Sequence, residues 1–224
     1  AIVAFYFWVI NKFSRKWWLI LVSAIFLALG TKWNVVFLPL ILLPWFWLLR
    51  KQKELGLLFK IKKLLFWGAL TITIPLILLI NLWPYLWTSP ISKLLTIFGF
   101  YGSLAVQDAQ FSKPSFAPLP FGFDGRALIY IVSMTPPIML VFFVIGLLVI
   151  IFKIIKSAYR ENILILLWLI VPLLRVIWQQ SAILGSIRNF IEYLVPFSII
   201  VGIGASIVIQ KLEVKIQKLN SKVK

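Results

Sequence analysis

The sequence predicts an all-α protein, a polytopic transmembrane helix bundle of about seven helical segments, and three observations lead to this fold class. Of its 224 residues, 62% are hydrophobic and 13% are charged, against about 45–50% and about 25% in soluble domains. Several uncharged runs approach or exceed the roughly 20 residues that cross hydrocarbon as a helix. The clearest are Leu64 to Asn81, Leu128 to Phe152 and Phe190 to Ile209. Basic residues lie between these runs.

The formal net charge of +17 indicates membrane topology and not nucleic-acid binding, because of where the basic residues lie. Seventeen of the 23 form four clusters on alternate loops, as the positive-inside rule requires of the cytoplasmic face. The clusters are Lys12, Arg15 and Lys16; Arg50, Lys51, Lys53, Lys60, Lys62 and Lys63; Lys153, Lys156 and Arg160; and Lys211, Lys215, Lys218, Lys222 and Lys224. We expect anionic membrane lipids of the cytoplasmic leaflet as their partners and no nucleic acid.

The first half of the chain is expected to cross the membrane several times and to return to the cytoplasmic face at the basic clusters. Ala1 to Ile10 ends an inward helix, and the apolar run is too short to span before Asn11, which favours a chain whose first helix has been cut. Trp17 to Gly30 and Val35 to Leu49 form an outward and inward pair. Each arm is short for a crossing, so either the helices stop below the outer surface or Lys32 snorkels to it. Leu64 to Trp83 then runs outward.

The second half contains the one long polar stretch and three further segments. Residues 84–127 form an external loop rich in Pro and Gly, with a short interfacial helix over Ile91 to Tyr101. The segments that follow are Leu128 to Phe152, inward and bent at Pro136 and Pro137; Asn162 to Trp178, outward; and Phe190 to Ile209, inward to the basic tail. We therefore expect one transmembrane domain over residues 1–224, a multi-pass protein of the cell membrane with a cytoplasmic C-terminus.

The absence of cysteine and histidine limits the chemistry of the chain. It excludes disulfides, thiolate and imidazole metal ligands, and Ser-His or Cys-His nucleophiles within these 224 residues. No metal site is expected. Chemistry here depends on carboxylates, amines, guanidinium groups or the backbone.

A few ionisable residues stand at membrane depth or in the outer segments, where charge is costly. Arg175 lies inside an apolar run and is expected to be a buried functional or structural cation. Arg188 and Glu192 are spaced i, i+4, which fits either an ion pair within one helix or a phosphate-binding role for Arg188. Lys32 is either an interfacial anchor or a phosphate contact.

Asp108 and Asp124 lie in the outer loop. Neither has a partner at helical or strand spacing that would tune its pKa, so solvated carboxylates are expected, with catalysis as the alternative.

Three stretches, together with a T-P-P some way beyond the second, resemble motifs of one family of membrane enzymes. Phe26-Leu27-Ala28-Leu29-Gly30-Thr31-Lys32-Trp33 is similar to G-L-A-x-x-T-K-[YW]. Trp83-Pro84-Tyr85-Leu86-Trp87-Thr88-Ser89-Pro90 is similar to Y-P-Y-L-W-x-[DN]-P, and Thr135-Pro136-Pro137 to the T-P-P that starts the following helix. Gly185-Ser186-Ile187-Arg188-Asn189-Phe190, followed by Leu194-Val195-Pro196, is similar to Y-D-G-x-R-H-F…P. These motifs resemble the GT-C class of glycosyltransferases, which includes protein O-mannosyltransferases and lipid A aminoarabinose transferase.

The resemblance implies a prokaryotic enzyme that transfers a sugar from a polyprenyl-phosphate carrier to an acceptor glycan, lipid or protein on the extracytoplasmic face. The sugar donor is then a substrate, and no cofactor is implied. Lys32, Arg188 and Arg175 become candidates for binding the lipid phosphate, and Tyr85 and Asn189 for binding substrate. Asn189 stands where the family has His, and Ser89 where it has Asp or Asn. The family's catalytic carboxylate lies in the first outer loop, which is expected upstream of Ala1.

Two other functions remain open from the sequence. A transporter or flippase for a lipid-linked or small solute would also use Pro-interrupted helices and an intramembrane Arg175. A membrane scaffold without chemistry would account for everything except the ordered motifs.

Overall fold

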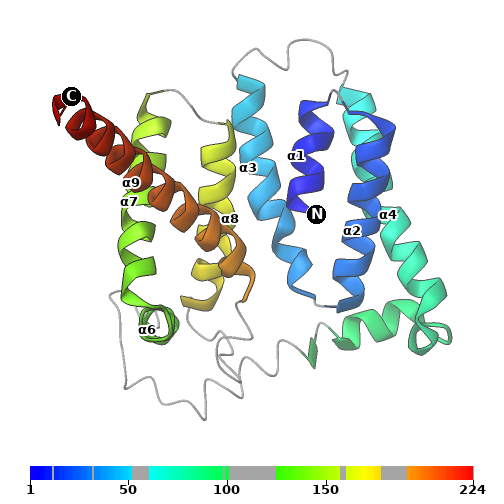
Figure 1. The fold of residues 1–224 in the computed structure, drawn as a ribbon. Coiled ribbons are helices and arrows are strands. Elements are labelled where there is room, and N and C mark those ends of the chain that lie inside the picture. Colours follow the sequence, from blue (N-terminus) through cyan, green and yellow to red (C-terminus); the bar gives the residue numbers. More distant parts are fainter. Residues whose placement is uncertain are drawn as a thin grey trace. The chain divides into compact units, whose positions relative to one another are not determined.

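The computed structural model describes residues 1–11, 13–31, 33–51, 61–97, 99–100, 125–156, 160–177 and 191–223 (Figure 1). Every regular element within those ranges is helical, so the predicted all-α class is confirmed for them. The chain divides into two compact units, Ala1–Ser103 and Leu104–Lys224, which are described separately below. The single transmembrane domain over residues 1–224 stays a prediction.

The first unit consists of helices that lie side by side and alternate in direction (Figure 1). They are α1 (Ile2–Ile10), α2 (Arg15–Thr31), the 3-10 helix η1 (Trp33–Phe37), α3 (Leu38–Lys51), α4 (Ile61–Leu82) and the 3-10 helix η2 (Pro84–Leu86). α2 packs against both α1 and α4. The predicted short pair exists as α2 and α3, with η1 between them.

A side-chain hydrogen bond joins the first part of α2 to the middle of α4. The indole Nε1 of Trp18 donates to Thr71 Oγ1 at 2.9 Å, and that hydroxyl donates to the carbonyl oxygen of Trp67 at 2.7 Å. The rings of Trp18 and Trp67 meet edge to face with centroids 4.8 Å apart. An indole N–H requires a partner when it is buried, and Trp18 is buried, so the bond fixes this contact in register.

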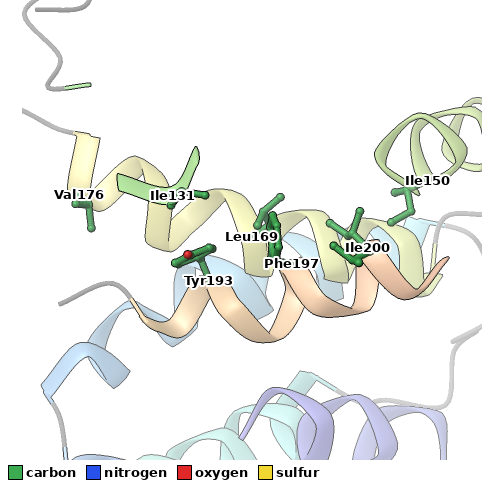
Figure 2. Packing of buried hydrophobic residues seen from close by; sticks show 8 residues of the cluster. Ile131, Ile150, Leu169, Val176, Tyr193, Phe197 and Ile200 are labelled. Atoms are coloured by element: carbon green, nitrogen blue, oxygen red, sulfur yellow. The ribbon is translucent and has the colours of Figure 1, made fainter. Parts of the chain in front are cut away.

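The second unit holds α6 (Arg126–Met134), α7 (Pro137–Ile155), α8 (Arg160–Ile177), the 3-10 helix η6 (Ile191–Tyr193) and α9 (Leu194–Val223). α7 and α9 run in the same sense and α8 in the opposite one, with α9 crossing α7 obliquely (Figure 1). Figure 2 shows the core of this unit, in which Tyr193, Phe197 and Ile200 of η6 and α9 belong to one buried cluster with Leu169 of α8.

The prediction of one bent helix over Leu128 to Phe152 is wrong, because the chain forms two helices there. α6 ends at Met134, Thr135 is extended at φ −97° and ψ 129°, and Pro136 has ψ 136°. A residue that precedes proline is driven out of the α region, and two consecutive residues precede a proline here. Pro137 then occupies the first turn of α7, where a missing N–H costs nothing.

The last helix differs from the predicted Phe190 to Ile209 at both ends. Residues 191–193 form the 3-10 helix η6, the α-helix begins at Leu194, and it continues for 30 residues to Val223. Hydropathy ends the apolar run at the first lysines, but Lys, Leu and Gln are good helix formers and the backbone continues through them.

α7 and α9 approach each other backbone to backbone at two glycines. A Cβ atom built on Gly146 would overlap the carbonyl oxygen of Ile200, and one built on Gly204 would overlap that of Phe142. At Gly202, two residues away, no heavy atom lies within 4 Å of such a Cβ. Small residues that allow close backbone approach are typical of helix packing in membranes.

Two helical segments in the described part of the chain are long and apolar enough to cross a membrane, Pro137–Ile155 and Ile191–Lys218. Only 11% and 33% of their apolar windows are buried within the protein, unlike the mostly buried core helix of a soluble protein. Val35–Leu49 and Phe66–Leu82 are shorter apolar helices. By length and composition, two of the about seven predicted crossing segments are thus present among the described residues.

Candidate functional site

The described residues include two of the five predicted binding residues. Tyr85 lies in η2 of the first unit and Arg175 in α8 of the second, so each is considered in its own surroundings. Lys32, Arg188 and Asn189 lie outside the described residues. The same is true of the outer-loop carboxylates Asp108 and Asp124.

Tyr85 belongs to a compact turn that is closed by a lysine. The Nζ atom of Lys93 donates to the carbonyl oxygen of Tyr85 at 2.6 Å and to the hydroxyl of Thr88. The same Nζ lies 4.7 Å from the centroid of the Tyr85 ring, within cation–π distance. We call these three residues the Lys93 turn.

The local sequence explains why the chain turns at this place. α4 ends at Leu82 because Trp83 precedes a proline and is extended, at φ −107° and ψ 98°. Leu86 is fully buried and packs in a cluster with Leu29 and Leu79. The turn is thereby anchored on α2 and α4.

A new helix then begins at residue 90. Residues 90–97 and 99–100 are helical, so a helix is present over the described part of the predicted Ile91 to Tyr101 segment, and its interfacial position stays a prediction. Its first backbone bond runs from the N–H of Lys93 to the carbonyl oxygen of Ser89 at 3.0 Å. Lys93 therefore stands one turn into the helix, from where its side chain reaches back to Thr88 and Tyr85.

The ammonium group of Lys93 donates its hydrogen bonds to uncharged groups. Its two hydrogen-bond acceptors are a carbonyl and a hydroxyl oxygen, and Glu54 is the only acidic residue in the sequence of the first unit. The Lys93 turn therefore has the electrostatic character of an anion-binding site.

Two tryptophans, Trp83 and Trp87, stand on either side of Tyr85 in the sequence. The rings of Trp83 and Tyr85 have centroids 5.9 Å apart, and the indole Nε1 of Trp87 donates to the carbonyl oxygen of Asn81 at 3.1 Å. Trp and Tyr concentrate at the headgroup level of membranes, where lipid phosphates lie.

Sequence reasoning missed Lys93. A signal was present, because Lys93 is the only basic residue between Lys63 and Lys113 and follows the Trp83 to Pro90 motif directly. Spacing alone does not show that its side chain folds back onto that motif.

Arg175 has a carboxylate partner on a different element. Its Nη2 atom lies 3.9 Å from Glu192 Oε2, and the two side chains are 21% and 28% exposed. The pair links the last turn of α8 to η6, beside the buried side chains of Val176 and Tyr193. At this distance the contact is an ion pair longer than a charge-assisted hydrogen bond.

This contact gives Glu192 a partner on another element. Glu192 lies in the 3-10 helix that precedes α9, and Arg175 stands seventeen positions earlier, on α8. Arg188 lies outside the described residues, so its two predicted roles, an ion pair with Glu192 or a phosphate contact, stay predictions. The structure thus gives Arg175 a structural partner.

No cluster that could ligate a metal occurs in the part of the chain that the structure describes, where no three His, Cys, Asp or Glu residues come together. Comparison of the chain with protein-family models, curated proteins and solved structures found no match.

Proposed function

We propose that this chain is a multi-pass membrane protein that binds a polyprenyl-phosphate-linked sugar at the extracytoplasmic surface, as part of a GT-C-type glycosyltransferase. The observation that carries the proposal is the Lys93 turn, an ammonium group that has no carboxylate partner among the described residues and lies over the ring of Tyr85. The GT-C resemblance supplies the reaction, and the geometry supplies a candidate for the phosphate contact.

The exposed surface of the first unit supports a membrane environment. Large apolar side chains on α2, α3 and α4 are more than half exposed, and soluble proteins rarely present so many together. They include Leu19, Leu27, Leu40, Leu43, Phe66, Ile72 and Ile77. Lipid chains are the solvent that suits this surface.

Aromatic residues at both ends of the apolar part of α4, Phe66–Leu82, support the same conclusion. Trp67 is the seventh residue of the helix, and Trp83 lies just beyond its end, sixteen residues later. At the helical rise this separation is about 24 Å, close to the hydrocarbon thickness of about 30 Å. The two tryptophans fit the two interfacial belts.

Basic residues give the orientation. Arg15 and Lys16 lie in the first turn of α2, and Lys62 and Lys63 in the first turn of α4. By the positive-inside rule this end is cytoplasmic, and the Lys93 turn at the opposite end of α4 is then extracytoplasmic. Polyprenyl-phosphate sugars used on that side carry their phosphate at the same depth.

The positions of two motifs agree with the family pattern. Trp83 to Pro90 lies where α4 ends, and Thr135-Pro136-Pro137 directly precedes or opens α7. Both are the positions that the GT-C resemblance implies.

The proposed chemistry is nucleophilic substitution at the anomeric carbon of the sugar. An acceptor hydroxyl or amine forms the new bond to that carbon while the bond to the carrier phosphate oxygen breaks. A carboxylate takes the acceptor proton, and polyprenyl phosphate leaves with the bonding electrons. Lys93 stabilises the charge that grows on the departing phosphate, and Lys32 and Arg188 are further candidates for that role.

Binding of a long-chain polyprenyl phosphate to the purified chain in nanodiscs tests the proposal. Lys93→Met should weaken binding by about tenfold, since a charge-assisted contact contributes about 1.5 kcal/mol or more. Lys93→Arg should retain most of the affinity, and Lys156→Met serves as a matched loss of one positive charge at the basic end. Equal affinity of wild type and Lys93→Met for the phosphate, or equal affinity of wild type for phosphate and uncharged polyprenol, would exclude this site.

A flippase or transporter is the second candidate, favoured by prolines inside helices that are otherwise continuous. Pro44, Pro75 and Pro172 lie within α3, α4 and α8. Transporters use such positions to bend or break helices around a substrate. Protein-dependent movement of a labelled polyprenyl phosphate across vesicle membranes, without any sugar acceptor, would favour this function over transfer.

A further inference from the structure

We propose that the C-terminal part of α9, residues 209–223, is a docking surface for the headgroups of anionic phospholipids. The inference rests on the membrane embedding in the proposed function and is independent of the sugar donor. It begins from the length of α9, whose 30 residues span about 45 Å at the helical rise, against about 30 Å of hydrocarbon.

The apolar and charged residues of this segment lie on separate faces. Ile209, Leu212 and Ile216 are spaced three and four residues apart and share one face of the helix. Lys211, Lys215 and Lys218 share a second face beside it, and the sequence continues the same spacing to Lys222.

The apolar face is exposed along its whole described length. Ile209, Leu212 and Ile216 are 55%, 54% and 55% exposed, and residues 209–218 are all exposed. α9 projects clear of the other helices of its unit after it crosses α7 (Figure 1). Nothing else in the described part of this unit covers the face.

The charges of residues 209–223 indicate that the partner is anionic. Residues 209–223 contain four lysines and one glutamate, Glu213, which stands apart from the lysine row. A lysine row beside an apolar stripe is the arrangement of helices that lie at an anionic membrane surface. Since Ile191–Lys218 is itself a candidate membrane span, the lysines emerge directly at the headgroup layer.

The geometry limits how far the lysines stand from the bilayer. If α9 enters hydrocarbon near Leu194, about 20 residues bring it to the opposite boundary near Glu213. Lys211 then lies at that boundary and Lys218 about 10 Å further along the axis. The oblique course of α9 shortens that height, so Leu212 and Ile216 can remain in contact with lipid while the lysine stems reach phosphates.

The test uses the absence of cysteine from this chain, which makes every introduced thiol unique. Nitroxide labels are placed singly at Ile216→Cys on the apolar face, Gln217→Cys on the polar face and Leu148→Cys on the exposed side of α7. The full chain is reconstituted in phosphatidylcholine vesicles with and without phosphatidylglycerol. Accessibility to oxygen reports lipid contact, and accessibility to a water-soluble nickel chelate reports water.

The expected result is lipid contact at Ile216 and water contact at Gln217 in vesicles with phosphatidylglycerol. Without it, or in high salt, the Ile216 label should become accessible to the nickel chelate. Each replacement of a lysine by Gln should lower the ratio of immersed to water-exposed Ile216 label by about fivefold, because each lysine contributes about 1 kcal/mol at an anionic surface. A control variant exchanges lysine and glutamine at two pairs of positions, which keeps composition and net charge but breaks the lysine row. It is Gln210→Lys/Lys211→Gln/Gln217→Lys/Lys218→Gln. It should reduce immersion of the Ile216 label as removal of lysines does.

Three results would overturn the proposal, and they differ in meaning. A water-accessible Leu148 label would show that α7 is outside the bilayer and would remove the proposed membrane embedding itself. A lipid-accessible Leu148 with an Ile216 label indifferent to phosphatidylglycerol would remove only the docking surface. An Ile216 label shielded from both reagents in every lipid would mean that protein covers the face.

Discussion

Two cationic side chains, Arg175 and Lys93, occupy opposite electrostatic situations. Arg175 lies 3.9 Å from a carboxylate of Glu192, so its charge has a partner within the protein. Lys93 is fixed by a carbonyl oxygen, a hydroxyl and an aromatic ring, all of them neutral. The charge of Arg175 therefore has a structural role within the protein. The charge of Lys93 is the one that we propose binds an external anion.

Removing either member of the Arg175–Glu192 pair should destabilise the second unit. Arg175→Met and Glu192→Gln each leave a partly buried charge without its counter-charge, which costs about 1–3 kcal/mol. Denaturant unfolding in detergent micelles measures the loss, with Lys215→Met as an exposed control near zero. The double variant should lose less than the two single losses added together. Additive losses would show that the two charges do not interact.

The sequence predicts part of this chemistry, and the limits have physical causes. Arg175 stands out because a cation in an apolar run is costly. Its partner Glu192 does not stand out in the sequence. The two residues meet through the packing of η6 on α8, whereas the i, i+4 rule describes contacts within one α-helix. Lys93 is overlooked for a similar reason, since its contacts depend on the turn that Pro84 and Pro90 impose.

At the scale of helices, the crossing of α7 and α9 depends on two particular glycines. Gly146→Ala and Gly204→Ala each place a methyl group on the backbone of the facing helix, which neither side can avoid by a change of rotamer. We expect each to lower the free energy of unfolding by about 1–3 kcal/mol or more. Thermal unfolding of the solubilised protein measures the effect.

Gly202→Ala is the matched control for this prediction. It lies on the same helix with open space around it, and alanine is the better helix former by about 0.5–1 kcal/mol. It should be neutral or slightly stabilising. If all three variants were equally tolerated, the close approach of α7 and α9 would be refuted.

Helix positions are predicted well where hydropathy and proline give clear signals, and less well elsewhere. α2, α3, α4, α7, α8 and α9 each overlap a predicted segment. Hydropathy does not distinguish a bend from a break, so the separation of α6 from α7 at Thr135 and Pro136 emerges only from the backbone. Nor does it show which of Gly202 and Gly204 contacts α7.

At the scale of the whole molecule, each unit carries basic residues at one end of its helices. In the first unit these are the first turns of α2 and α4, and in the second they include Lys153 and Lys156 at the end of α7. The opposite ends carry the Lys93 turn and α6. In the proposed membrane topology, the ends with more basic residues are the cytoplasmic ones.

The most direct test of this account is the sidedness of single cysteines in a host membrane. The chain has no cysteine, so Asn11→Cys, Ser92→Cys, Ser133→Cys and Lys156→Cys each carry one thiol. We predict that a membrane-impermeant maleimide labels Ser92→Cys and Ser133→Cys in intact cells, and Asn11→Cys and Lys156→Cys only after permeabilisation. Labelling of Asn11→Cys and Ser92→Cys from the same side would contradict a membrane-crossing first unit, and with it an extracytoplasmic Lys93 turn.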